Sequence, residues 1–113
     1  MNKRTVGAAN EERAAKYLQE RGYALVLQNY LCFCGEIDIV AEESGALVFL
    51  EVKYRRTTDF GLPEQAVDAR KMKRIRNAAM CFLKEHRLSP DTTIRFDVVA
   101  MDEREIRLYQ NAF

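Results

Sequence analysis

Four charged residues interrupt two apolar runs that together are typical of a β-hairpin. Glu36 and Asp38 lie in "GEIDIVAEE", and Glu51 and Lys53 lie in "ALVFLEVKY". Because side chains alternate between the two faces of a strand, all four are expected on one face. Carboxylates are hard oxygen ligands of divalent cations, so residues of these types on one face could bind a metal ion. The ordinary alternative is a solvated, salt-bridged face of the sheet.

The hairpin register predicts which of these charges oppose each other. A turn centred on Ser44-Gly45 sets Asp38 opposite Glu51 and Glu36 opposite Lys53. Glu36 and Lys53 would form an ordinary cross-strand ion pair. Two carboxylates about 5 Å apart would repel by roughly 3 kcal/mol at an effective dielectric constant of 20. We therefore expect a positive group between the two acids, supplied by a lysine or by a divalent cation.

Hydrophobic periodicity, glycines and prolines place this hairpin in a chain of two helices and five strands. The expected helices span residues 7–21, with Gly22 as C-terminal cap, and residues 61–88, with Pro63 in the first turn. The expected strands span residues 23–31, the two arms of the 35–56 hairpin, and 93–101 and 105–110, which flank a turn at "DER". This order, αβββαββ, predicts an α/β fold in which a mixed central sheet is flanked by helices.

The first expected helix carries an acidic residue on its apolar face. At 100° per residue, Glu11 shares an arc with Ala8, Ala14, Ala15 and Leu18. A carboxylate on a core-facing stripe needs a partner, because an unpaired buried charge is costly. We therefore expect Glu11 to meet Asp38, Glu51 and Lys53 beneath this helix. In the second helix, the stripe of Met72, Ile75, Ala79, Phe82 and Leu83 is expected to pack on the sheet.

Length and composition favour one domain, spanning residues 1–113, without membrane segments. The chain is 48% apolar and 31% charged, and it has no apolar run near the roughly 18 residues that cross a bilayer. Its first residues are charged and helical rather than apolar, so a cytoplasmic location is expected. The formal net charge is only +1, yet the segment from Lys53 to Arg76 contains eight basic and three acidic residues. That local charge of +5 predicts a basic face suited to a polyanion.

The three cysteines, Cys32, Cys34 and Cys81, do not suggest a disulfide framework, which fits a reducing compartment. With His86 they could supply four zinc ligands, but their spacing is not that of a zinc finger. We expect small buried or idle thiols instead.

The sequence resembles a nuclease family at specific positions. An Asp on one strand, followed by Glu-x-Lys ("EVK") on the next and preceded by a Glu-bearing helix, resembles the PD-(D/E)xK core of the archaeal Holliday junction resolvases. The combination of "GEID", "FLEVKYRR" and "RFDVVA" more closely resembles the YraN family of small bacterial proteins over nearly the whole chain. This chain departs from the patterns at Ile37, which replaces the proline, and at Leu31, where relatives often have Arg.

The resemblance implies a restriction-endonuclease-like fold, a single resolvase-like nuclease domain and a metal-dependent active site. Asp38, Glu51 and the backbone carbonyl of Val52 would hold Mg²⁺ or Mn²⁺, and Glu11 would complete the site directly or through water. Lys53 would position or deprotonate the attacking water and offset charge in the transition state. Resolvases act as dimers, so the resemblance allows a homodimer, although the residues identify no interface.

Basic and polar residues around the expected second helix are candidates for nucleic-acid contacts. By resemblance, Gln65 and Lys71 are candidates for supporting the site or contacting phosphate. The basic candidates for the nucleic-acid backbone are Arg55, Arg56, Arg70, Lys71, Lys73, Arg74 and Arg76. Asp97 follows Arg95 on its strand, so we expect it to be a structural partner of a basic residue rather than a metal ligand.

Three functions follow from these residues. The first is a metal-dependent endonuclease that hydrolyses phosphodiester bonds in structured or branched DNA. The second is a nucleic-acid-binding module on the same fold without useful turnover. The third and weakest is a protein-interaction domain whose acidic cluster is structural, because such a role does not need two facing carboxylates.

Overall fold

A computed structural model of the chain describes residues 3–55 and 68–113. The elements, in chain order, are α1 (Lys3–Glu20), β1 (Ala24–Cys32), β2 (Gly35–Glu43), β3 (Ala46–Tyr54), α3 (Ala69–Glu85), β4 (Ile94–Met101) and β5 (Ile106–Tyr109). The predicted α/β order is confirmed, with a five-stranded mixed sheet and two helices in the described ranges. None of the described helices is long and apolar enough to cross a membrane.

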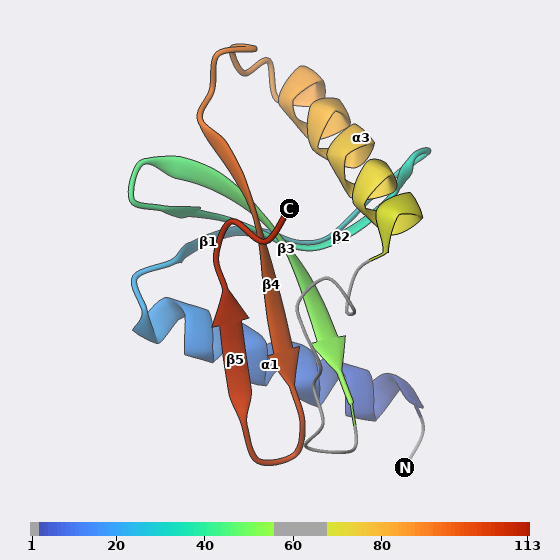
Figure 1. Ribbon diagram of the computed structural model, residues 1–113, viewed down its shortest axis with the longest axis vertical. Coiled ribbons are helices and arrows are strands. Elements are labelled where there is room, and N and C mark those ends of the chain that lie inside the picture. The colour runs from blue at the N-terminus through green and yellow to red at the C-terminus, as the bar shows by residue number, and fades with distance from the viewer. Residues whose placement is uncertain (1–2, 56–67) are drawn as a thin grey trace.

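The strands lie side by side in the order β1-β2-β3-β4-β5 (Figure 1). β3 and β4 pair in parallel, and the other neighbouring strands pair antiparallel. A parallel pair needs a long crossover connection, and α3 lies within the segment that joins these two strands. The β1–β2 hairpin runs across the direction of β4 and β5, so the sheet is strongly twisted.

The predicted register of the central hairpin is confirmed over its paired length. Ile39 pairs with Leu50, and Val40 with Phe49. Ser44 and Gly45 form the turn with φ angles of 51° and 80°. Two successive positive φ angles are those of the tight hairpin turn whose twist matches its flanking strands, which is why a glycine at this point predicts the register.

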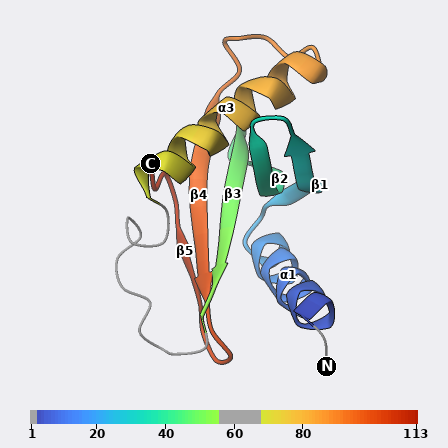
Figure 2. The same cartoon turned by 90° about the vertical axis from the view of Figure 1, so that its right-hand side faces the viewer.

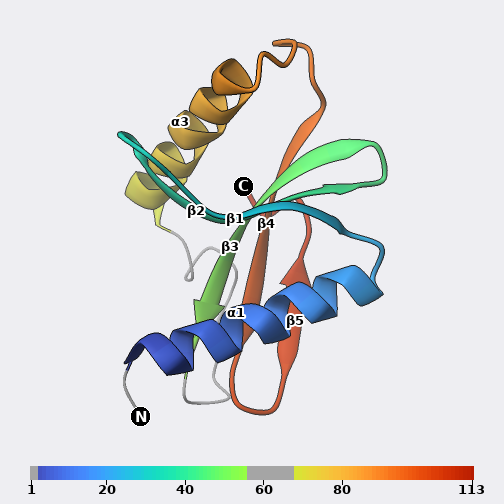
Figure 3. The same cartoon turned by 180° about the vertical axis from the view of Figure 1, so that it is seen from behind.

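In the part of the chain that the structure describes, each face of the sheet is covered by one helix. α1 lies across the back of the sheet (Figure 3), and Leu18 of this helix packs with Ile39 and Leu50. α3 lies against the opposite face (Figure 2), and its Phe82 packs with Phe49. The alternate residues of the hairpin therefore enter two different apolar clusters. The expectation that α1 covers the face of Asp38, Glu51 and Phe49 was wrong, because α3 covers that face.

The second helix ends at Glu85, before the predicted residue 88, and the predicted residues 61–67 lie outside the described residues. α3 begins at Ala69, because Asp68 has an extended backbone and its side chain accepts a 2.8 Å hydrogen bond from the Lys71 backbone N–H. Pro63 lies outside the described residues. The predicted apolar stripe is confirmed: Met72 packs against the core, and the other four predicted residues are buried.

Asp97 anchors a buried polar network, as predicted. Arg95 donates two 2.9 Å hydrogen bonds to the fully buried Asp97 carboxylate. Tyr23 and the backbone N–H of Asn111 also donate to this carboxylate, at 2.7 and 2.8 Å. Arg95 further pairs with Glu43 at 2.8 Å. Both Asp97 oxygens are occupied by these partners, so the carboxylate holds β4 to neighbouring segments.

Candidate functional site

Strands β2 and β3 separate at the position of the predicted acidic pair. Their paired register ends at Ile39 and Leu50, while β3 continues alongside β4 as far as Tyr54. Beyond this last pair, the Val52 backbone N–H donates a 2.8 Å hydrogen bond to Oδ2 of Asp38. A side-chain carboxylate thus replaces a backbone carbonyl as acceptor. The result is a fork in the sheet that holds Asp38 in a fixed position beside β3.

Asp38 and Glu51 meet in a pocket at this fork. The pocket has a volume of about 170 Å³ and is lined by Gly35, Glu36, Asp38, Glu51, Lys71, Arg74 and Ile75. Glu51 is only 5% exposed and Asp38 is half-buried. Burial, together with the neighbouring negative charge of Glu51, raises the pKa of Asp38 to about 7, and the Val52 hydrogen bond opposes this increase. The two carboxyl groups therefore interact as the register predicts.

A lysine from α3 supplies part of the positive charge that the acidic pair requires. Lys71 forms an ion pair with Glu51, and its charge also lowers the pKa of Asp38. Asp68 fixes this residue, because it caps α3 at the Lys71 backbone N–H. The sequence predicted Lys71 near the site through the resemblance alone. The signal in the residues themselves is the capping Asp three positions before it.

The other two charges of the hairpin do not pair with each other in the described structure. Glu36 is exposed at the pocket rim and lies opposite Leu31 of β1, because β2 has left β3 at this point. Lys53 is half-buried, lies opposite Ala100 of β4, and shares the face of Glu51 by alternation. The expected Glu36–Lys53 pair was therefore wrong, because the fork separates their strands.

Glu11 lies apart from the acidic pair. It is half-buried on α1, and its carboxylate accepts a 3.3 Å hydrogen bond from the Asn29 side chain of β1. Among the described residues, Glu11, Asp38 and Glu51 do not form a group whose carboxylate oxygens all lie within 4.8 Å. The expectation that they meet beneath α1 was wrong because α1 packs on the other face of the sheet. A water-mediated role for Glu11 stays a prediction.

Several predicted basic residues lie along the exposed side of α3. Arg70, Lys73 and Arg74 are exposed, and Arg74 also lines the pocket. Arg76 instead lies near aromatic rings, 5.7 Å from the ring centre of Phe113. Arg55 directly follows β3, and its backbone N–H donates a hydrogen bond to the Met101 carbonyl oxygen of β4. Arg56 and Gln65 lie outside the described residues. We call Arg70, Lys73 and Arg74 the basic face of α3.

A larger pocket, of about 460 Å³, lies at the other end of the β2–β3 hairpin. Its lining includes Gly45, Ala46 and Leu88, together with Glu43, which is already paired with Arg95. The smaller pocket is the stronger candidate because its charged groups converge at the fork.

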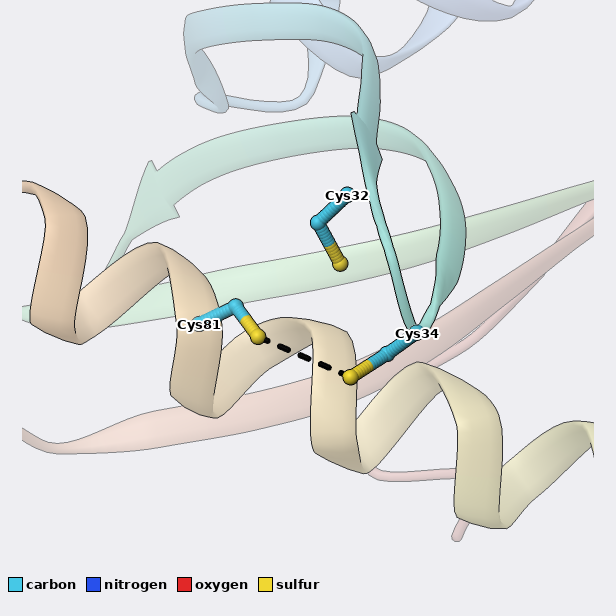
Figure 4. A group of neighbouring side chains, drawn as sticks. All are labelled: Cys32, Cys34 and Cys81. Atoms are coloured by element: carbon cyan, nitrogen blue, oxygen red, sulfur yellow. Dashed lines mark hydrogen bonds between the residues drawn. The ribbon is translucent and has the colours of Figure 1, made fainter.

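The three cysteines form a group that the sequence did not predict. Their sulfur atoms all lie within 4.8 Å of one another, and Cys34 Sγ lies 3.6 Å from Cys81 Sγ (Figure 4). His86 does not belong to this group, since its Nδ1 contacts the Phe82 carbonyl oxygen at 2.9 Å and its ring stacks on Phe82. The considered zinc set of three cysteines and His86 is therefore not assembled. The contact of Cys81 with a remote "CFC" depends on how α3 docks, which spacing in sequence does not reveal.

Comparisons with other proteins place the chain in a family. The model of "Uncharacterised protein family UPF0102" matches residues 10–101. A UPF0102 protein of Lachnoclostridium phytofermentans is 51% identical over 113 residues, which cover all of this chain and 96% of the relative. A UPF0102 protein of Caldicellulosiruptor saccharolyticus is 36% identical over 119 residues, which cover both chains completely. These matches confirm the resemblance to the YraN proteins, and the chain belongs to the UPF0102 family.

Proposed function

We propose that this protein is a metal-dependent endonuclease that hydrolyses phosphodiester bonds in structured or branched DNA. The observation that carries this proposal is the meeting of Asp38 and Glu51 in a pocket at the β2–β3 fork. An Asp on one strand and Glu-x-Lys on the next, within a mixed sheet, is the arrangement expected of a PD-(D/E)xK core. A restriction-endonuclease-like core is thus part of the same proposal.

The residues of the pocket fit a hard divalent cation. Asp38 and Glu51 offer carboxylate oxygens, which Mg²⁺ and Mn²⁺ prefer, and their mutual repulsion would be relieved by a cation between them. The Val52 backbone carbonyl would be a third ligand. When bound, the ion would stabilise charge on the phosphate oxygens and lower the pKa of a bound water.

The chain's own residues would divide the remaining tasks. The Val52 N–H orients the Asp38 carboxylate, since it occupies one of its oxygens. Lys53, on the same face of β3 as Glu51, would hold or deprotonate the attacking water. Lys71 already reaches Glu51 and would move to a substrate phosphate when a cation takes that carboxylate. The basic face of α3 would contact the DNA backbone on the approach to the pocket.

Two observations favour a second candidate, a nucleic-acid-binding module without turnover. Lys71 occupies the Glu51 carboxylate that a cation would need, and Glu11 contacts Asn29 rather than the acidic pair. A stable ion pair could replace the cation as the group that offsets the acidic charge. The basic face of α3 would then serve binding alone.

A cleavage assay distinguishes the two candidates. Purified protein would be incubated with labelled duplex, flap and four-way junction DNA in Mg²⁺, in Mn²⁺ and in EDTA. The test variants are Asp38→Asn, Glu51→Gln and Lys53→Met, which preserve side-chain size. Glu42→Gln is the matched control, because Glu42 is an exposed acid on the same strand as Asp38.

We expect metal-dependent cleavage of branched DNA by the wild-type and Glu42→Gln proteins. Each of the three test variants should lose at least about a hundredfold in rate, the usual scale for removing a group that stabilises the transition state. Cleavage that persists in Glu51→Gln would reject the nuclease proposal. Salt-sensitive binding that is equal in all variants, without cleavage, would establish the binding module instead.

A further inference from the structure

The three cysteines bring together two segments that are far apart in sequence. Cys32 ends β1 and Cys34 lies in the β1–β2 turn, whereas Cys81 lies on α3. Figure 4 shows the three sulfur atoms turned toward one another between the hairpin and the helix. All three side chains are half-buried, and Phe33 between the first two is 94% exposed. Solvent therefore reaches a group of thiols whose positions are set by the packing of the hairpin on α3.

The distances between the sulfur atoms suit ligands of one metal ion. Thiolate–metal bonds are about 2.3 Å long, so three sulfurs around one ion in a plane lie roughly 4 Å apart. The Cys34 and Cys81 sulfurs are 3.6 Å apart, and every pair in the group is within 4.8 Å. Adjustments of less than about 1 Å would bring all three onto one ion. A disulfide would instead need two sulfurs about 2.05 Å apart and would leave the third unused.

The donor set determines which kind of ion it would take. Thiolates are soft ligands and select soft ions such as Cu(I) or borderline Zn²⁺ over Mg²⁺. Structural Zn²⁺ takes four protein ligands, and within the described ranges no other Cys, His, Asp or Glu joins this group. Cu(I) is satisfied by three thiolates. We propose that Cys32, Cys34 and Cys81 form a three-thiolate site for a single Cu(I) ion.

Binding at this site exchanges protons for the metal without a change of oxidation state. Burial, together with hydrogen bonds to the other two cysteines, raises the pKa of the Cys81 thiol to about 11. The thiol is thus protonated at neutral pH. Three S–H bonds would break and three S–Cu bonds would form, with the protons released to solvent. This exchange does not involve the acidic pocket, so the inference is independent of the proposed nuclease function.

A competition titration tests the site. Fully reduced protein would be titrated with Cu(I) under argon against a Cu(I)-specific chromogenic chelator, and in parallel with Zn²⁺ against a zinc indicator. The variants are Cys32→Ser, Cys34→Ser and Cys81→Ser. Met80→Leu is the matched control, because Met80 is a 49% exposed sulfur residue next to Cys81 that lies outside the group. Circular dichroism of each variant would establish that it is folded. Cys34→Ala provides a second variant in the exposed turn.

We expect one Cu(I) per chain in the wild type and in Met80→Leu, with protection of all three thiols from a thiol reagent. Each cysteine variant should bind at least about a hundredfold more weakly, which exceeds the loss on removing a residue that only orients a ligand. Equal affinity in folded Cys81→Ser or Cys34→Ala would overturn the proposal. So would tighter binding of Zn²⁺ than of Cu(I), or formation of a Cys34–Cys81 disulfide without metal binding by the reduced protein.

Discussion

The Val52 backbone N–H donates to the Asp38 carboxylate over 2.8 Å where strands β2 and β3 cease to pair. In a continuous ladder this N–H would have served a neighbouring strand. Here it fixes an acid beside Glu51, which is itself nearly fully buried. The fork thus places two carboxyl groups close together, and their mutual repulsion destabilises the folded protein. The fold alone does not require this contact. This relationship leads to predictions about stability as well as activity.

The metal-free protein should lose stability as pH rises. The pKa of Asp38 is about 7 in the folded chain and near 3.8 when unfolded, so the folded state holds the proton more tightly. Its contribution is fully present below pH 4 and disappears as pH approaches and passes 7. In EDTA, Asp38→Asn should therefore gain on the order of 1–2 kcal/mol over wild type at pH 8, and much less at pH 5. Urea unfolding at both pH values measures this difference, and an equal effect at both would contradict it.

Divalent cations should stabilise the folded protein through the acidic pair. A ligand at a concentration 100 times its dissociation constant stabilises the folded state by about 2.7 kcal/mol. Mn²⁺ or Mg²⁺ should raise the melting temperature of wild type and of Glu42→Gln, and the shift should be lost in Glu51→Gln. Differential scanning fluorimetry with and without EDTA provides the measurement. An identical shift in Glu51→Gln would place the cation elsewhere.

The basic face of α3 should control the salt dependence of DNA binding. Each phosphate contact contributes about 0.9 to the slope of log K against log salt concentration for B-DNA. Combined replacement of Arg70, Lys73 and Arg74 by alanine should therefore reduce the slope by roughly 2–3. Lys16→Ala, on exposed α1 surface, should leave it unchanged. Fluorescence anisotropy over a salt series would reveal this, and an unchanged slope in the triple variant would exclude this face.

The Asp97 network should be essential for folding rather than for activity. Removing one partner of a buried, hydrogen-bonded ion pair typically costs about 3–5 kcal/mol, because the other charge is left unpaired. We expect a loss near the lower end of this range for Asp97→Ala, because Tyr23 and the Asn111 backbone N–H lose their acceptor while Arg95 keeps Glu43. Glu105→Gln changes a mostly exposed pair with Arg107 and should cost less than about 1 kcal/mol. Chemical denaturation of both variants gives the comparison.

The sequence predicted the structure best where a feature depends on residues close together in the chain. Alternating apolar residues and Gly45 predicted the register that sets Asp38 toward Glu51, and Arg95 close in sequence predicted the pairing of Asp97. Both faces of β2 and β3 are apolar where residues 39–41 pair with residues 48–50, so periodicity could not assign a helix to either face. That ambiguity produced the wrong placement of Glu11.

Features that depend on how α3 docks on the sheet could not be predicted from patterns among residues close in sequence. The ion pair of Lys71 with Glu51 and the contact of Cys34 with Cys81 each join residues from separate elements. Their geometry follows from where α3 begins and how Phe82 packs on Phe49 and Tyr30. The capping Asp68 marks where α3 begins, but the docking of this helix on the sheet has no signature in residue spacing.

The parallel pairing of β3 with β4 also has a consequence for how the chain folds. The β1–β2 and β2–β3 hairpins can form from contacts between neighbours in sequence, but β4 can join β3 only after the intervening segment, α3 included, has been brought back across the sheet. Closing such a loop is entropically slow. We expect the β1–β3 hairpins to be protected early from amide exchange during refolding, and the interior of β4 to be protected late. Because Lys71, Arg74 and Cys81 arrive with α3, both the acidic pocket and the thiol group would be completed only in that last step.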